Sequence, residues 1–576
     1  MKLKNIVLST LGIVTLASCS EQMDYKEFSI RDAEYMKKKF DRAGGFISTI
    51  YADLDSDFGN YGGAMLSSAT DESVYSHSGN AIESFFDGSW SASNANGSLW
   101  TTCYHGIAYC NLFLDEFTGL TFDDYKLDKN YEAEMYQYNN YQWEARWARA
   151  YFYFLLVRQY GGVPLITSNM SADEANAQPR ATAEEIFKFI DDECVAIKDT
   201  ITKDYGDLGN LAMSPANNGR ANNLAVLALR ARAALYHASP LFNPNNDTEL
   251  WRKAAETNKA VIDSCTARGM SLGDYATLFN GEESWKNAAA TREIIFGRRM
   301  PTANNTIETY NFPVGMSGEG AGGQGGNCPT QNLVDAYEMT NGKLISDPES
   351  GYDPQNPYQG RDKRLAMTVA RNGDTWPNAN TIPLETFVGG VHGLPTTYAT
   401  TTGYYLRKYV NASVKIAASG SSAATTVNHV WVTFRLAEFY LNYAEAMFNL
   451  SGNGYSAANG FTMTPEYAIN VVRKRAGQPN LPAGLSSTDF KSRYENERFV
   501  ELAFEGHRFF DVRRWKEAEK YFKTIRGMQI TKNSDDTFTY TPVTVQNRQW
   551  NDKMYLFPIP QNELLKAGNL TQNPGW

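Results

Sequence analysis

The chain has 576 residues and a formal net charge of −10, and 13% of its residues are aromatic. The acidic balance argues against a nucleic-acid partner, which usually needs a basic face. The aromatic content exceeds what a core alone usually needs, so we expect some aromatic residues on a binding surface.

The N-terminus carries the pattern of a lipoprotein signal peptide. Lys2 and Lys4 precede an apolar run over residues 6–16, and small residues then lead to Cys19. The run is shorter than the roughly 20 residues of a spanning helix, which indicates a cleaved targeting segment. Cys19 resembles a lipobox cysteine, so we predict a signal peptide over residues 1–18 and a lipid anchor on Cys19. The alternative is an ordinary secretory signal with an incidental thiol.

Helical spacing of apolar residues recurs along the chain. Residues 143–154, 224–235 and 436–447 each carry an apolar stripe, which predicts helices. Gly161 and Pro164 follow the first of them as stop residues. Small alanines alternate with large aromatics in these stripes, which suits paired helices of tetratricopeptide type, although no strict repeat is present. We predict a mostly α fold.

Long stretches rich in Gly, Asn, Pro, Ser and Thr separate the helical blocks. We expect loops with short strands there, and loops of this length inside a compact body usually carry function. The predicted irregular regions are residues 200–222, 300–332 and 345–430, with strands at 294–296 and 404–410 and an extended segment at 555–560.

The cysteines and histidines form no metal or redox pattern. No two cysteines have C-x-x-C spacing, and no two histidines have H-x-x-x-H spacing. We therefore predict no metal, no cofactor and mostly buried thiols. The residues concerned are Cys103, Cys110, Cys194, Cys265 and Cys328, and His77, His105, His237, His392, His429 and His507.

A series of sequence blocks, in a shared order along nearly the whole chain, resembles the SusD/RagB family. Each block is weak alone, but the order is specific. The blocks are residues 144–151 (EARWARAY), 160–165 (YGGVPL), 231–236 (ARAALY), 329–343, 361–365 (RDKRL), 435–446, 470–477 (NVVRKRAG), 497–515 and 572–576 (QNPGW).

The resemblance implies a single SusD-like body over residues 19–576. Its N-terminal part spans about residues 22–240 and its C-terminal part about residues 290–576. Family members look like a tetratricopeptide-like helical scaffold with a large loop-rich ligand-binding half. They are lipoproteins of the outer membrane that face the cell exterior, and they are not enzymes.

The resemblance also implies a function. Members capture oligosaccharide at the cell surface and deliver it to a TonB-dependent barrel transporter of the SusC type. The alternatives left open are a peptide-capturing lid of the same transporter type, a lipid-anchored glycosidase and a structural helical-repeat adaptor.

Three glutamates near the C-terminus test the glycosidase alternative. Glu497, Glu501 and Glu505 share one helical face, amid several arginines. A glycosidase needs two carboxylates that flank a bond in a cleft. Abundant arginines favour a structural ion-pair network instead.

Carbohydrate binding requires a flat aromatic platform beside planar polar groups, because a sugar ring has one apolar face and a rim of hydroxyls. In residues 70–100 we predict Trp90 as the platform, with Asp71, Asn94 and Asn96 beside it. Trp100, which has helical spacing to later residues, is predicted in the core.

A second set of ligand contacts is predicted in residues 300–326. Tyr310 and Phe312 lie there between Asn-rich and Gly-rich segments. The alternative is that both aromatics pin the loop to the body. Weaker candidates from other loops are Trp285, Trp376 and Tyr398.

Overall fold

The computed structural model describes most of the chain. The described residues are 33–205, 219–279, 292–300, 302–316, 318–319, 322–376, 383–417 and 424–576. The predicted signal peptide, Cys19 and Trp285 lie outside these ranges. Within them, no helix combines the length and the apolar character needed to cross a membrane.

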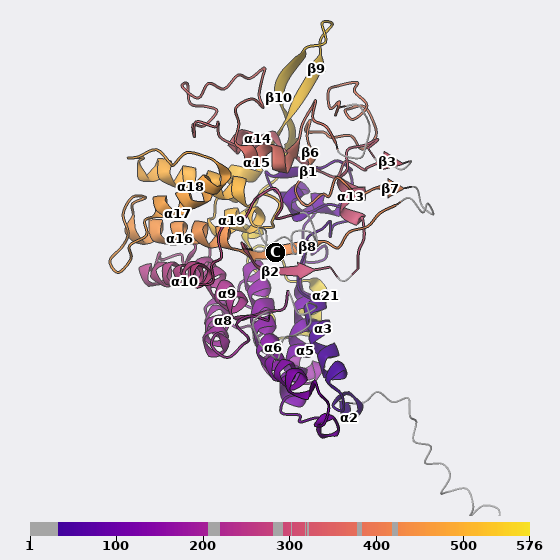
Figure 1. The fold of residues 1–576 in the computed structure, drawn as a ribbon, viewed down its shortest axis with the longest axis vertical. Helices are drawn as coiled ribbons and strands as arrows, with labels where there is room; N and C mark the ends of the chain where they lie inside the picture. The colour runs from indigo at the N-terminus through magenta and orange to yellow at the C-terminus, as the bar shows by residue number, and fades with distance from the viewer. Residues whose placement is uncertain are drawn as a thin grey trace, which may run out of the picture.

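A series of packed helices forms the scaffold (Figure 1). From α5 through α6, α8, α9, α10 and α16 to α17, each helix packs against the next, while α3 packs on α5 and α6, and α18 packs on α16 and α17. C-terminal helices thus continue the stack begun by N-terminal ones. The bounds are α3 (Phe40–Ala52), α5 (Trp100–Glu116), α6 (Tyr131–Tyr160), α8 (Ala183–Ile197), α9 (Asn223–Ala238), α10 (Thr248–Ala267), α16 (Leu436–Ser451), α17 (Pro465–Ala476) and α18 (Ser487–Glu501).

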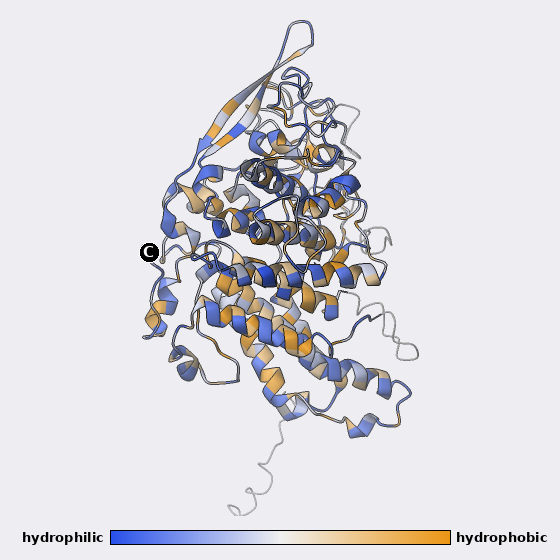
Figure 2. Ribbon diagram, turned by 90° about the vertical axis from the view of Figure 1, so that its left-hand side faces the viewer, coloured by the Kyte–Doolittle hydropathy of each residue, from blue (hydrophilic) through white to orange (hydrophobic). Residues whose placement is uncertain are grey.

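The three predicted helices are confirmed as α6, α9 and α16. α6 ends where Gly161 adopts a φ of 71°, a conformation that favours glycine. α9 begins where the Asn222 side chain accepts a hydrogen bond from the backbone N–H of Ala225. Most helices in Figure 2 carry both hydrophobic and hydrophilic residues, as helices that bury one face do.

The other helices of the described residues are short. They are α2 (Ala33–Met36), α4 (Ser84–Asp87), α7 (Ala172–Asn176), α13 (Thr306–Asn311), α14 (Gln331–Ala336), α15 (Lys363–Thr368), α19 (Arg508–Arg514), α20 (Ala518–Phe522) and α21 (Gln561–Lys566). Single 3₁₀ turns are η1 (Leu66–Ala69), η2 (Ala81–Glu83), η3 (Asp123–Tyr125) and η6 (Asp552–Tyr555).

The described strands form only two-stranded sheets, namely β1–β4, β2–β8, β3–β7, β5–β6 and β9–β10. The predicted strand at residues 294–296 is confirmed, as part of β2. Of residues 404–410 only β6 is strand, and Tyr555 ends η6 instead of opening an extended segment. The bounds are β1 (Ser73–Tyr75), β2 (Ile294–Arg299), β3 (Gly318–Glu319), β4 (Asn327–Pro329), β5 (Val369–Ala370), β6 (Tyr405–Leu406), β7 (Ile416–Ala417), β8 (Val430–Arg435), β9 (Thr524–Lys532) and β10 (Phe538–Asn547).

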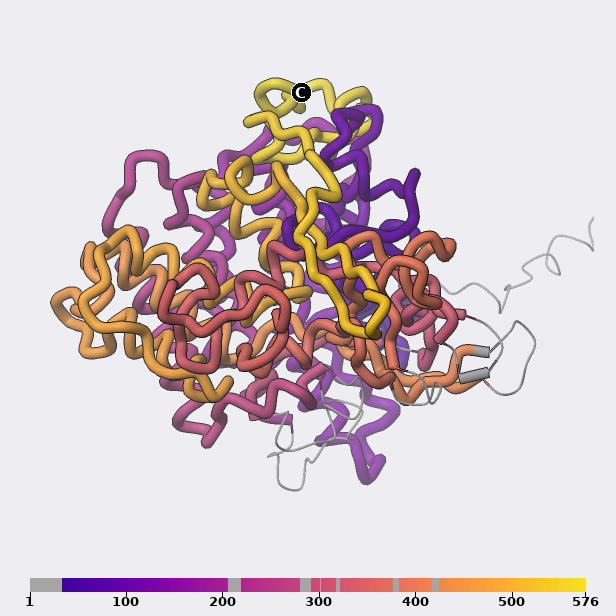
Figure 3. Tube along the Cα trace, turned by 90° about the horizontal axis from the view of Figure 1, so that it is seen from above, coloured from indigo at the N-terminus to yellow at the C-terminus, as the bar shows by residue number. Residues whose placement is uncertain are grey.

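The β9–β10 hairpin projects from the top of the molecule (Figure 1) and crosses its middle when seen from above (Figure 3). The outer edge of β9 bonds to the body, where Ile530 accepts from the N–H of Val388. On the outer edge of β10, the Gln355 amide bonds both backbone groups of Tyr540, at 3.2 and 3.0 Å. Two residues further along the same edge stands Pro542, which has no N–H to offer.

The hydrophobic core has two parts. The larger cluster fills the spaces between the scaffold helices and includes Trp147 and Tyr151. The second lies under the loops and includes Tyr337 and Tyr404. Five cysteines of the described chain are free and buried, as predicted. The loops therefore rest on a core of their own, which gives a ligand-binding surface a firm base.

Candidate ligand-binding surface

Trp90, the predicted platform, is a core residue. Its exposed fraction is 3%, and its ring packs against Phe85, Phe557 and Trp576 at centroid separations of 4.8, 4.7 and 5.0 Å. The indole N–H donates to the backbone oxygen of Asn96 at 3.2 Å. The structure corrects the prediction, because residues from the distant C-terminus cover a loop whose composition suggested exposure.

The two asparagines predicted beside Trp90 stabilise the protein's own turns. Asn94 donates from Nδ2 to the backbone oxygen of Ser89 at 3.2 Å. Asn96 donates from Nδ2 to the backbone oxygen of Ala81 at 2.6 Å. With Trp90 buried, neither amide flanks an exposed indole, and ligand contact by either asparagine stays a prediction.

Asp71 also has a structural role. Its buried carboxylate forms a two-point ion pair with Arg508, at 2.9 Å to Nε and 2.7 Å to Nη2. A carboxylate held in this way is not available to accept from sugar hydroxyls. Trp100 is buried, as predicted.

The two aromatics predicted near residues 300–326 have different positions. Phe312 is 1% exposed and packs edge-on against the buried Trp376, with ring centroids 5.1 Å apart. Both are corrected to core residues. Tyr310 is half-buried and lies beside Gly63, where an added Cβ would come within 2.6 Å of the Tyr310 ring. Tyr310 remains a candidate.

The exposed aromatic of this region is Tyr398, 51% exposed, which the sequence offered only as a weaker candidate. Its ring stacks on His77 with centroids 3.8 Å apart and planes 9° apart. His77 in turn lies 5.0 Å from the ring of Tyr75. We call the group the His77–Tyr398 surface. It comprises Tyr75, Ser76, His77, Tyr310, Gln324 and Tyr398.

Strand pairing positions His77. β1 pairs with β4, with Tyr75 opposite Asn327, and the N–H of Ser76 extends the ladder to the oxygen of Gly326 at 2.9 Å. The next residue, His77, points Nε2 at the backbone oxygen of Gln324, 2.7 Å away. The ring is thereby fixed at the end of the strand, ready for Tyr398 to stack on it.

Gly325 has no side chain, which allows the Tyr398 backbone to lie close to it. Gly325 has a φ of 78°, and a Cβ there would lie 2.1 Å from the Tyr398 backbone oxygen. Tyr398 itself has a φ of 63°, which is uncommon for a residue with a side chain. Gly325 is thus part of the packed support of the aromatic stack.

The chemistry of this surface suits a neutral ligand with one flat apolar face. Tyr398 offers the outer face of its ring, and the Ser76 hydroxyl, which donates to the backbone oxygen of Gln324 at 3.2 Å, belongs to the same surface. In the described part of the chain, no carboxylate is hydrogen-bonded to any residue of the surface. Nor do the described residues hold a group of three or more His, Cys, Asp or Glu side chains that could bind a metal.

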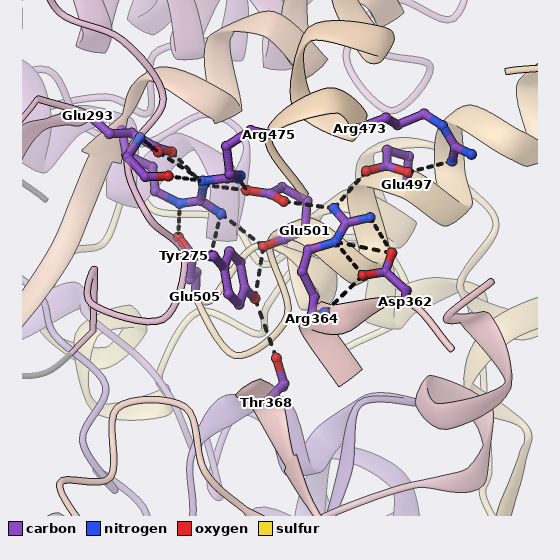
Figure 4. A network of polar contacts seen from close by, with 12 residues as sticks. Tyr275, Glu293, Asp362, Arg364, Thr368, Arg473, Arg475, Glu497, Glu501 and Glu505 are labelled. Carbon is purple, nitrogen blue, oxygen red and sulfur yellow. Dashed lines mark hydrogen bonds and ion pairs between the residues drawn. The ribbon is translucent and has the colours of Figure 1, made fainter. Parts of the chain in front are cut away.

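The glutamates considered for catalysis lie inside the protein (Figure 4). Glu501 accepts from Arg435 and Arg364 at 2.6 and 2.8 Å and also pairs with Arg475. Burial alone would raise the pKa of Glu501, but the three arginines lower the pKa below its usual range. A permanently ionised, enclosed carboxylate cannot donate a proton to a glycosidic oxygen.

The other two glutamates are paired in the same way. Glu497 accepts from Arg364 and Arg473 at 2.7 and 2.9 Å. Glu505 accepts from Arg435 and Lys408 at 2.6 and 2.7 Å. The predicted structural ion-pair network is confirmed, and it joins the loop-rich half to the scaffold helices.

A helical scaffold, a loop-rich half and an exposed aromatic stack define a ligand-binding protein of the helical-repeat class. The profile of the SusD family matches residues 292–576, and that of a second family, described as starch-binding and associating with the outer membrane, matches residues 38–235. The chain belongs to the SusD family, as the order of its sequence blocks predicted.

Known proteins resemble the chain over most of its length. SusD-like protein P2 of Formosa agariphila is 24% identical over 455 residues, covering 75% of this chain and 73% of that protein. A SusD-like protein of Bacteroides fragilis has a similar structure, with a TM-score of 0.74, 22% identity and coverage of 94% and 98%. A laminarin-binding SusD-like protein has a TM-score of 0.61, 20% identity and coverage of 94% and 100%. These likenesses establish the mostly helical fold.

Proposed function

We propose that the protein captures a neutral oligosaccharide at the His77–Tyr398 surface and does not cleave it. The observation that carries the proposal is the exposed Tyr398 ring, held parallel to His77 at 3.8 Å. A rigid aromatic face of this kind matches the apolar face of a sugar ring. Membership of the SusD family and similarity to carbohydrate-binding proteins also support glycan binding.

We also propose that the bound sugar passes to a TonB-dependent barrel of the SusC type, from an outer-membrane position facing the cell exterior. This step rests on family membership and on the predicted lipid anchor. Its test is co-purification with such a barrel from native membranes, followed by loss of oligosaccharide uptake when the present chain is deleted.

The platform is tested by Tyr398→Ala. A glycan array first identifies the best oligosaccharide, and calorimetric titration then measures its affinity. Loss of a stacking hot spot of about 2 kcal/mol or more weakens binding roughly 30-fold. The melting temperature stays close to that of the wild type, since the side chain is half exposed. Tyr398→Phe keeps the ring and retains most of the affinity.

Tyr467 provides the matched control, because it is another tyrosine with high exposure, 59%, but lies on the scaffold helix α17. Tyr467→Ala leaves the affinity unchanged. Wild-type affinity in Tyr398→Ala would contradict the platform. Retention of peptides and of no glycan would favour the peptide-capturing alternative, and release of shortened sugars would favour the glycosidase.

A further inference from the structure

A cavity of about 340 Å³ lies away from the His77–Tyr398 surface, between α5, residues 164–176 and the C-terminal segment that contains α21. In Figure 1, α5 and α21 lie below β1 and α13. The cavity shares no residue with the His77–Tyr398 surface. Its volume lies at the lower end of the range of small-ligand sites, about 300–1,000 Å³.

One wall of the cavity is fixed to α5 by side chains. The hydroxyl of Tyr104 donates to the backbone oxygen of Pro164 at 2.8 Å. Asn111 donates from Nδ2 to the backbone oxygens of Ile166 and Ser168, at 3.2 and 3.1 Å. These bonds hold the loop at a set distance from the helix, so the cavity does not depend on a ligand to keep it open.

The opposite wall is fixed in a similar way. Asn569, which follows α21, donates from Nδ2 to the backbone oxygen of Ala177 at 3.0 Å. Arg180 donates from Nη1 to the backbone oxygen of Thr571 at 2.9 Å. The C-terminal segment is therefore tied to the loop that forms the other side, and all three walls form one rigid frame.

The cavity lining combines apolar side chains with polar groups that make no hydrogen bond within the described residues. Ile107, Ile166 and Leu570 supply apolar surface. Trp100 also lines the cavity, and its indole Nε1–H has no acceptor among the described residues.

Four further polar side chains of the lining make no hydrogen bond within the described chain. They are Thr101, Ser168, Asn169 and Asn176. A ligand that carries hydroxyls around a compact carbon ring would use both the apolar and the polar parts of this lining.

The charged groups of the lining cancel. Lys566 pairs with Glu563 at 2.9 Å, and His105 lies 2.6 Å from Asp53. Because Lys566 and Glu563 pair with each other and His105 already bonds the Asp53 carboxylate, the lining offers no unpaired charged side chain to an ionic ligand. This balance favours a neutral ligand.

We propose that this cavity is a second carbohydrate site that binds one neutral sugar residue. The proposal rests on the proposed glycan-binding function, but not on the His77–Tyr398 surface. A terminal residue of a long glycan, or a free monosaccharide, has the required size and chemistry. A second site would let the protein hold one polysaccharide at two places.

The test uses neighbouring residues of α5. Thr101 lines the cavity, whereas Thr102 is also exposed but does not line it. Thr101→Trp fills the cavity, and Thr102→Trp adds the same side chain outside it. Saturation-transfer NMR on the mature lipid-free protein measures binding of the methyl glycosides of glucose, galactose, mannose and xylose.

At least one glycoside is expected to bind the wild type and Thr102→Trp equally, and Thr101→Trp at least tenfold more weakly. The same glycoside still binds Tyr398→Ala, which separates this site from the platform. Binding of no glycoside, equal binding to Thr101→Trp and Thr102→Trp, or preference for glucuronate over the neutral sugars would overturn the proposal. Failure of the platform alone would show instead as unchanged oligosaccharide affinity in Tyr398→Ala.

Discussion

At the scale of single residues, burial separates the candidate aromatics that pack in the core from the one that faces solvent. Trp90 and Phe312 lie in loops whose composition suggested exposure, yet both are buried. Tyr398 is exposed because a left-handed backbone turn directs it outward and His77 supports one face. Contacts between residues so far apart in sequence cannot be deduced from local composition. For this reason the sequence indicates Tyr398 only as a weaker candidate for ligand contact and does not indicate His77 as a site residue.

The burial of Trp90 leads to a prediction about stability. Trp90→Ala removes a side chain enclosed by three aromatic rings, which typically costs about 3–5 kcal/mol of unfolding free energy. Denaturant unfolding measures the change. Trp143→Ala, at a partly exposed position of α6, serves as the control and costs less. A Trp90→Ala variant as stable as the wild type would show that the indole is not part of the core.

At the scale of elements, the sequence predicts the helices better than the strands and loops. α6, α9 and α16 follow from apolar spacing and stop residues, because both are local properties. The β9–β10 hairpin was missed, although alternating Ile, Val, Thr and Tyr around the turn at residues 533–537 is a strand signal. Residues 70–100 and 300–326 contain five of the six residues of the His77–Tyr398 surface, but Tyr398 lies in neither region, since the surface depends on loops that meet in space.

The ion-pair network links elements, so its loss should affect stability. Glu501 connects α15, α17, α18 and the end of β8 through three arginines. Glu501→Gln leaves buried guanidinium groups short of a partner and costs about 3–5 kcal/mol. Thermal unfolding measures the loss, and Glu519→Gln, at an exposed ion pair, changes stability by at most about 0.5 kcal/mol.

The pH dependence of this effect has a definite sign. The folded-state pKa of Glu501 is lowered, so its stabilisation is fully present above the usual carboxyl pKa and is lost as the pH falls through the lowered value. The difference between wild type and Glu501→Gln should stay constant at neutral pH and shrink only in strong acid. Shrinkage near pH 7 would contradict the assignment.

At the scale of the whole molecule, the predicted attachment to the membrane depends on Cys19. No helix of the described ranges can span a bilayer, and Cys19 is the predicted lipid site. In cells without the partner barrel, Cys19→Ala should move the protein from the washed membrane pellet to the soluble fraction. Cys265→Ala, which changes a buried thiol of the body, should stay in the pellet. A pelleted Cys19→Ala variant would refute the anchor.

The projecting hairpin would matter for a protein that the predicted lipid anchor confines to a surface. Lipid-anchored copies meet at a high effective concentration, and an open strand edge is a template on which identical chains add and aggregate. The Gln355 amide occupies the exposed edge of β10 at Tyr540, and Pro542 removes a donor two residues on. The hairpin can therefore project from the body without seeding intermolecular sheets between neighbouring copies.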